Sequence, residues 1–389
     1  MKSIFDYESI LPLLKENDNI NVDKQIKKKL KFDNYLKGYK IDLLGKAFNA
    51  KQVLEVIDVV NYLKRNKYHN ISILFNFLCS IIADKLVYVI FEDLCYYFIN
   101  KINCQLYVKF PNLKATIMTD GIKFSAISQL PNKQCFNKAY LKHIYKRHYR
   151  DIISVGSIVN AGLSILTQDV RCFLINNGLG NDYSGQLSEV ISEIVGNACE
   201  HGKSDCILDI DVTDNYKKEN NQEEDAYYGV NVTIVNYSKY LFYDLLMEKM
   251  NINSPPQGRY KYVHVARKNH SKFWEADGYN EEDFFIISSF QHKISGSSRK
   301  PADVGGTGLT TLIKSLEDYS DSNECYLLSG KRCLRFLSEY LTYDKNNLIG
   351  FNKSNDYINN APEISLLGIC KVFFPGSAFN LHFVLKKNI

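Results

Sequence analysis

Within residues 189–202, EVISEIVGNACEHG, two of the three carboxylates and an amide have spacings that could support phosphate chemistry. Glu189, Glu193 and Asn197 follow one another at intervals of four, so a helix would place them on one face. An amide oxygen can bind Mg²⁺, and a carboxylate one turn away could orient or deprotonate a water molecule. We therefore take Asn197 as a candidate metal ligand, Glu193 as a candidate catalytic base and Glu189 as a solvated residue. The same pattern is also typical of a helix face that only contacts water.

A glycine-rich turn later in the chain could bind phosphate. GGTGL precedes a predicted helix and supplies the candidate binding residues Gly305, Gly306, Thr307, Gly308 and Leu309. Glycines let backbone N–H groups approach an anion, and the unpaired N–H groups and dipole of a helix N-terminus favour one. Just upstream, Arg299 and Lys300 could reach a terminal phosphate. An ordinary glycine turn and a solvated basic loop are the alternatives.

Two polar residues continue the predicted buried faces of strands. In GVNVTIVN, Asn236 shares the parity of the apolar residues at 230, 232 and 234. In PGSAFNLHFVL, Ser377 shares the parity of Phe379 and could face the same pocket. A buried amide needs a partner, and an adenine edge offers both a donor and an acceptor. The alternative is that Asn236 ends its strand and begins a turn.

The order of these motifs resembles the GHKL ATP-binding fold, found in histidine kinases, type II topoisomerases, chaperones of the ninety-kilodalton class, MutL and anti-sigma-factor serine kinases. E-x-x-x-N-A at 193–198 is followed by a strand with a polar end, a long insertion, GGTGL and a last strand preceded by G-S. The resemblance covers about residues 140–389. It implies a Bergerat-type α/β sandwich with a mixed sheet, and Mg-ATP held between sheet and helices. Asn197 would hold Mg²⁺, the GGTGL amides would hold the phosphates, and residues 251–310 would form an ATP lid.

The chain departs from that family at one motif. Asn236, Tyr237 and Ser238 stand where the family has Asp-x-Gly, so an amide would supply the adenine contact. Three functions remain open. The first is a slow Mg-dependent ATPase switch that signals to a protein partner, with Glu193 activating water. The second is a protein serine/threonine kinase of the anti-sigma-factor type, and the third is a non-catalytic nucleotide- or protein-binding regulator.

The residues before this region predict a smaller α/β domain. Strand-like patterns occur at 37–44, 70–77 and 104–110, and helix-like patterns occur at 50–66 and 84–101. A strand, helix and strand at 70–110 predict a parallel pair. By the order and length of its elements, this unit resembles STAS-type domains, which bind partner proteins.

The predicted layout has four parts. They are a helical segment at 1–36, the STAS-like domain at 37–130, a linker at 131–139 and the GHKL domain at 140–389. Within the last part, residues 206–212 predict a half-buried strand, because apolar residues alternate with Asp209 and Asp211. That pattern places both aspartates on the polar face of the strand.

Composition narrows the classes of partner. A net charge of +5, from 48 basic and 43 acidic residues, does not call for nucleic acid. No long apolar run or signal-like N-terminus is seen, and ten cysteines without a CxxC pair indicate reduced thiols. We therefore expect a cytoplasmic protein without membrane contact. The GHKL resemblance implies ATP and Mg²⁺ as cofactors and a signalling or STAS-domain protein as partner, with a homodimer as one option.

Overall fold

The computed structural model of the chain gives a mixed α/β protein with two main sheets. The structure describes residues 7–78, 81–82, 84–110, 125–157, 162–216, 227–251, 258–274, 278–294, 308–320 and 325–387. A four-stranded mixed sheet lies in the N-terminal part, and a six-stranded antiparallel sheet lies in the C-terminal part.

The N-terminal part is built around a short sheet of three parallel strands and one antiparallel edge strand. Its elements are η1 (Tyr7–Ile10), α1 (Leu11–Glu16), η2 (Ile20–Val22), α2 (Asp23–Lys29), β1 (Lys31–Asp33), β2 (Gly38–Leu43), β3 (Ala47–Phe48), α3 (Ala50–Arg65), β4 (Ser72–Phe77), β5 (Ile81–Ile82), α4 (Lys85–Tyr97), η3 (Phe98–Ile102), β6 (Gln105–Lys109), η5 (Ala126–Gln129) and α5 (Lys133–Leu141). The sheet order is β1-β2-β4-β6, with β2, β4 and β6 parallel and β1 antiparallel at the edge. The parallel pair predicted at 70–110 is therefore confirmed as β4 and β6.

The C-terminal part is built on the larger sheet. Its elements are β7 (Lys142–Tyr145), β8 (His148–Ile153), α6 (Val155–Ser157), α7 (Leu163–Asn176), α8 (Asn181–Gly202), β9 (Cys206–Tyr216), β10 (Tyr227–Tyr237), α9 (Asp244–Asn251), α10 (Tyr260–His270), η7 (Ser271–Phe273), α11 (Glu281–Ser288), α12 (Gly308–Tyr319), β11 (Tyr326–Arg335), η8 (Ser338–Tyr340), η9 (Ile364–Leu366) and β12 (Leu367–Lys386). The strand order is β11-β12-β10-β9-β8-β7. Every neighbouring pair is antiparallel, so the mixed sheet expected from the GHKL resemblance is wrong for the described strands.

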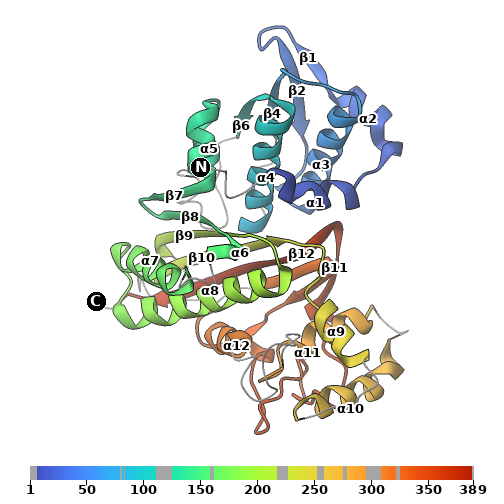
Figure 1. Cartoon of the computed structure of the whole chain (residues 1–389), viewed down its shortest axis with the longest axis vertical. Coiled ribbons are helices and arrows are strands. Elements are labelled where there is room, and N and C mark those ends of the chain that lie inside the picture. The colour runs from blue at the N-terminus through green and yellow to red at the C-terminus, as the bar shows by residue number, and fades with distance from the viewer. Residues whose placement is uncertain are drawn as a thin grey trace.

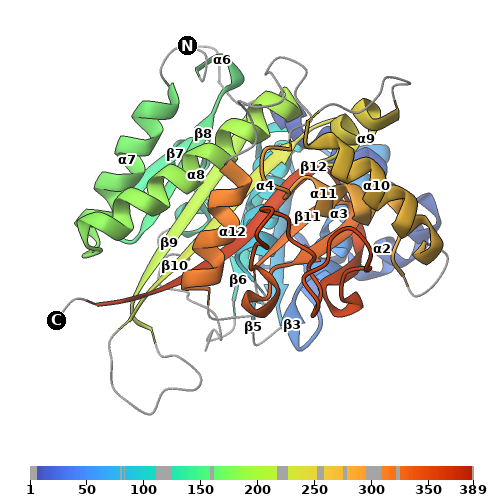
Figure 2. The ribbon, with the colours of Figure 1, turned by 90° about the horizontal axis from the view of Figure 1, so that it is seen from below.

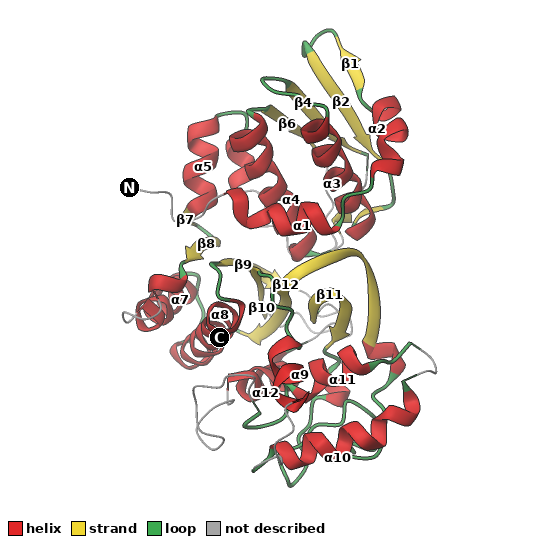
Figure 3. Cartoon of the chain, turned by 45° about the vertical axis from the view of Figure 1, so that its right-hand side comes forward, coloured by secondary structure: helices red, strands yellow, loops and turns green. Residues whose placement is uncertain are grey.

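Both faces of the six-stranded sheet are covered (Figure 1). Helices α1, α3 and α4 of the N-terminal part lie against one face, and Figure 3 shows the same layers from another side. Helices α7, α8 and α12 cover the other face (Figure 2). Residues of β10 alternate between the two resulting cores, since Ile234 packs on the α8 side and Val235 on the α4 side.

Helix α4 is buried on every side because it lies between the two sheets. All of its residues from Lys85 to Tyr97 are buried, including Glu92 and Asp93. Asp84 begins the helix by accepting a hydrogen bond from the backbone N–H of Val87. An apolar helix without an exposed face is typical of such an internal position.

Residues 131–139, which we expected to form a linker, mostly belong to α5. Asn132 caps this helix through the N–H of Cys135, and Phe136 and Tyr140 are fully buried. The Tyr140 ring stacks on Tyr96 of α4 at 4.1 Å between centroids. This segment therefore packs the N-terminal part together instead of only connecting two domains.

The described part of the expected ATP lid contributes to the core. The segment 258–294 contains α10 and α11, and Phe284 and Phe285 of α11 are completely buried. Arg332 of β11 forms an ion pair with Asp283 and so fixes α11 to the sheet. Residues 252–257, 275–277 and 295–307 of the expected lid lie outside the described residues. Movement of the α10–α11 segment as a lid would therefore expose apolar core.

Two general expectations can be compared with the structure. Within the described ranges, no helix combines the length and apolar character needed to cross a membrane. The nine cysteines in those ranges are free thiols, and five of them are buried. The reduced thiols expected from the sequence are therefore confirmed there.

Candidate functional site

A pocket between α8 and the six-stranded sheet brings together four residues chosen from the sequence. Asn197 comes from α8, Leu309 from the first turn of α12, and two others, Asn236 and Ser377, come from β10 and β12. Asn236 and Ser377 stand opposite each other in the β10–β12 register. Segments separated by up to 180 residues thus converge on one cavity.

Helix α8 turns its polar stripe toward the start of α12. Its apolar residues Ile191, Ile194 and Val195 are buried against the sheet, as the helical spacing predicts. Gly308 begins α12 directly beside the stripe. A Cβ atom added at Gly308 would lie 2.7 Å from Glu193 Oε2 and 3.1 Å from Asn197 Nδ2. A larger residue here would displace the Glu193 carboxylate, so the GGTGL and E-x-x-x-N motifs are in close contact at residue 308.

Asn236 is buried and its amide nitrogen is already engaged. Nδ2 donates to Ser204 O and Ser204 Oγ, each at 2.9 Å, and to Asp205 O at 3.1 Å. Oδ1 lies against Gly202, where an added Cβ would collide with it. The side chain therefore holds the α8–β9 connection, and only its oxygen remains for an adenine amino group.

In the GHKL family, which this sequence resembles, the Asp-x-Gly motif ends in glycine. Ser238 stands at that position in this chain. Its Oγ donates to Gly202 O at 2.6 Å and accepts from Tyr240 N at 2.9 Å. Tyr237 points to the other face of the sheet and donates to Asp93 Oδ2 of α4 at 2.7 Å. This turn therefore joins the end of α8 to the N-terminal part.

The pocket is small and mostly apolar. Its volume is about 70 Å³, below the ~300–1,000 Å³ usual for small-molecule sites. Residues that sequence reasoning missed form much of its wall, namely His201, Gly202, Tyr240, Leu241, Phe242, Leu245, Leu246, Ser289, Ile294 and Phe379. The apolar run YLF at 240–242, two residues after the end of β10, was the sequence signal that could have identified part of this wall.

Glu193 and Gly308 line a neighbouring pocket of about 310 Å³. Its other polar side chains are Glu189, Ser164, Thr167, Ser192 and Thr311. Thr167 Oγ1 donates to Leu163 O and contacts Ser192 Oγ, each at 2.8 Å. Both glutamates are exposed, so Glu189 is solvated as expected while bordering the same polar pocket as Glu193.

The remaining sequence candidates cannot be placed. Arg299, Lys300, Gly305, Gly306 and Thr307 lie outside the described residues. Of the GGTGL motif, the structure therefore positions Gly308 and Leu309.

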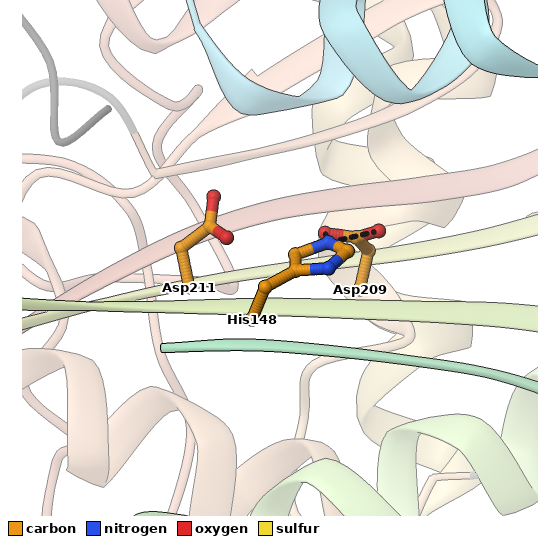
Figure 4. Close-up of side chains that lie close together, drawn as sticks. All are labelled: His148, Asp209 and Asp211. Atoms are coloured by element: carbon orange, nitrogen blue, oxygen red, sulfur yellow. Dashed lines mark hydrogen bonds and ion pairs between the residues drawn. The ribbon is translucent and has the colours of Figure 1, made fainter. Parts of the chain in front are cut away.

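The polar face expected for β9, which carries Asp209 and Asp211, is buried in the structure. The alternation of apolar and polar residues is present, yet both aspartates are completely buried. They point with His148 of β8 from the sheet toward the N-terminal part (Figure 4). Lys85 of α4 bonds both carboxylates, with Nζ 2.6 Å from Asp209 Oδ1. A polar strand face is therefore covered by a helix that brings the opposite charge.

Arg150 is the centre of the same buried network. Its guanidinium is 2.5 Å from Glu92 Oε2, 3.1 Å from Asp93 Oδ1 and 3.0 Å from Asp209 Oδ2. It also lies 4.5 Å from the centroid of the Tyr140 ring. Neighbouring carboxylates hold the pKa of Arg150 above its ordinary value despite burial. The cation thus stabilises several buried acids at once.

The ligand atoms of His148, Asp209 and Asp211 lie within 4.8 Å of one another and could in principle hold a metal ion. His148 Nε2 is 3.1 Å from both oxygens of Asp209. The Lys85 ammonium, however, contacts both aspartates and is itself buried. The positive charge beside these carboxylates therefore comes from Lys85 and, at Asp209, also from Arg150.

Asp93 makes protein stability depend on pH. Burial raises its pKa from 3.8 to about 6, although Arg150, Tyr237 and Tyr140 oppose this rise. The folded state therefore holds a proton between pH 4 and 6 that the unfolded state releases, so this contribution to stability is present below pH 4 and is lost as pH rises through 6. Replacing Asp93 with Asn should remove that decline, so the variant should gain about 3 kcal/mol relative to wild type from pH 4 to 7. Urea denaturation across this range measures the difference, and parallel curves for the two proteins would contradict it.

Comparison of the chain with known protein-family models, curated proteins and solved structures found no match. A functional proposal therefore depends on the motifs and on the geometry of the two adjoining pockets.

Proposed function

We propose that the protein is an ATP-binding switch of the GHKL type that hydrolyses ATP slowly with Mg²⁺ and signals to a protein partner. The observation that carries the proposal is the approach of Gly308 to Glu193 and Asn197, next to a pocket lined by Asn197, Asn236 and Ser377. These residues belong to four separate motifs whose order resembles the GHKL fold. A helix face and a glycine turn that are unrelated in function would not be expected to lie in contact at this one residue.

In this proposal, the apolar pocket binds the base of ATP and the polar pocket binds its phosphates. The apolar pocket suits a purine, with Asn236 Oδ1 accepting from its amino group. The polar pocket would take the phosphates as their Mg²⁺ complex, because Glu189 and Glu193 line it and would repel a bare anion. Its hydroxyls and the start of the twelve-residue helix at Gly308 can donate hydrogen bonds to phosphate oxygens. Asn197 would hold Mg²⁺, which would neutralise phosphate charge. Glu193 would orient and deprotonate the attacking water.

The apolar pocket fits this ligand only after it widens. The volume of about 70 Å³ requires side chains at its wall to move before a purine enters. The engaged Nδ2 of Asn236 leaves one hydrogen-bonding atom for the base. Both features favour a second candidate function, a non-catalytic regulator that binds a protein without nucleotide.

The route of the signal is also part of the proposal. Asn236 faces the pocket, whereas the next residue, Tyr237, bonds Asp93 in the N-terminal part. Rearrangement at Asn236 on ATP binding would therefore act on α4 through one peptide unit. The N-terminal part, if STAS-like, would present that change to a partner protein or to a second copy of the chain.

Calorimetric titration with ATP and Mg²⁺ tests the assignment of Asn197. Asn197→Ala should lose Mg²⁺-dependent ATP binding, because the proposed metal ligand is absent. Asn181→Ala, at the exposed start of the same helix, is the matched control and should bind as wild type does. Wild-type protein that binds no ATP would reject the switch and support the non-catalytic regulator.

Phosphate release tests Glu193 separately. Glu193→Gln should lower turnover by about 100-fold or more and keep ATP binding, since general-base catalysis contributes roughly 10²–10⁴. Asp182→Asn, at the exposed start of the same helix and outside both pockets, should keep both properties. Normal hydrolysis by Glu193→Gln would show that this carboxylate is not the base. Labelled phosphate appearing on a STAS-domain protein would instead support the serine/threonine kinase alternative.

A further inference from the structure

We propose that the cavity between the N-terminal part and the outer end of the six-stranded sheet is a second binding site, for a small organic anion with an apolar body. The cavity has a volume of about 460 Å³, within the ~300–1,000 Å³ typical of small-molecule sites. Its walls are the first turns of α3 and α4 and the facing parts of β11 and β12. This site is separate from the proposed nucleotide pocket and does not depend on ATP binding.

The cavity lies where parallel sheets usually bind ligands. Ala50 and Val53 belong to the start of α3, which follows β2 and β3, and Leu86 and Val87 belong to the start of α4, which follows β4 and β5. In open α/β sheets, ligands bind beyond the carboxyl ends of the parallel strands. Here β11 and β12 close that crevice from the opposite side, so a ligand would contact both parts of the chain.

The interior of the cavity favours an apolar group. Asp84, a half-buried carboxylate that lines the cavity, already accepts from Val87 N at 2.9 Å and from Tyr326 OH at 3.0 Å. Burial raises the pKa of Cys333 to about 12 and also raises that of Cys370, so both thiols stay protonated. Protonated thiols behave as polarizable apolar surface and do not supply the thiolates that a metal ion needs.

The charge at the mouth selects an anion. Arg335, the last residue of β11, both lines the cavity and is exposed. Ile369 lines it too, with 69% of its surface exposed. A guanidinium can bind a carboxylate through two parallel hydrogen bonds. A ligand such as a medium-chain carboxylate would therefore place its head on Arg335 and its chain over Val53 and Leu86.

Such a ligand would also strengthen the contact between the two parts. Its apolar body would touch α3 and α4 on one side and β11 and β12 on the other. A molecule that binds only the folded, docked state stabilises that state in proportion to its occupancy. Thermal stability should therefore rise with ligand concentration.

Titration calorimetry of the full chain with octanoate, 1-octanol and octylammonium tests the proposal. Octanoate should bind more tightly than octanol, and octylammonium should bind weakest, because only the carboxylate can pair with Arg335. Arg335→Glu should weaken octanoate binding about tenfold or more, the value of a lost charge-assisted hydrogen bond. The matched control is Arg171→Glu on the exposed side of α7, which should bind octanoate as wild type does.

A second variant checks the apolar part of the site. Ala50→Leu places extra volume in the cavity at a helix start where leucine is tolerated, and it should weaken octanoate and octanol alike. Equal affinities for the three ligands, or an unchanged affinity in Arg335→Glu, would overturn the selection of an anion. Absence of octanoate binding to the wild type would overturn the site itself.

Discussion

Arg150→Met should destabilise the protein by about 3–5 kcal/mol at neutral pH, the usual cost of removing one partner from a buried ion pair. The guanidinium is completely buried and contacts Glu92, Asp93 and Asp209. Without it, Glu92 and Asp93 would lose the cation that contacts them, and Asp209 would share Lys85 with Asp211. Chemical denaturation followed by circular dichroism measures the loss.

Two controls separate the charge from the size of the side chain. Arg171→Met on the exposed face of α7 should change stability by less than about 0.5 kcal/mol. Asp93→Asn in the Arg150→Met background should recover part of the loss, because it removes one unpaired charge and touching residues are not additive. The deficit should also shrink as pH falls, since carboxylates without a cation take up protons more readily. A loss below about 1 kcal/mol at pH 7 would mean that the network contributes little to the docked state.

Gly308→Ala should reduce ATP turnover about 100-fold while leaving the protein folded, because displacement of a catalytic group by about 1 Å can cost 10²-fold. The new Cβ would meet Glu193 Oε2 at 2.7 Å and Asn197 Nδ2 at 3.1 Å. The Glu193 carboxylate is exposed and can turn aside, while the contacts of the new Cβ with Glu193 Cβ and Asn197 Nδ2, each at 3.1 Å, need shifts of a few tenths of an ångström. The expected effect is thus on function, and phosphate-release kinetics beside a thermal melt measure both.

Gly185→Ala is the matched control for this substitution. Gly185 lies in α8, and an added Cβ there would meet nothing within 4 Å. Alanine should therefore leave turnover unchanged and should slightly increase stability, because it is the better helix former. Wild-type turnover in Gly308→Ala would contradict the roles assigned to Glu193 and Asn197.

Local patterns in the sequence predicted many of the helices and strands. Period-two and helical spacing gave β2, β4 and β6, the helices α3 and α4, and the buried side of α8. Each pattern depends on the sequence of one segment, so it can be recognised without knowing which other segment packs against it. The predictions failed where packing against another segment of the chain determines the local structure. The expected linker at 131–139 lies mostly in α5, where Phe136 is buried and the following Tyr140 stacks on Tyr96 of α4.

The candidate site shows the same division. Motif order selected Asn197, Asn236, Leu309 and Ser377, which line one pocket. It gave no indication that Asn236 Nδ2 would be engaged by Ser204 and Asp205, or that the wall from Tyr240 to Leu246 would leave so little space. Hydrogen-bond partners and free volume depend on how separate segments pack, and spacing along one segment does not contain them.

The sequence alone determined which residues of β9 share a face, because successive side chains of a strand point to opposite sides. It placed Asp209 and Asp211 together, opposite the apolar residues. Only the tertiary structure decided that this face is buried, since Lys85 lies 126 residues before Asp211 and reaches it through the docking of α4. A buried charge needs an opposite charge beside it, and the fold determines whether the two lie together.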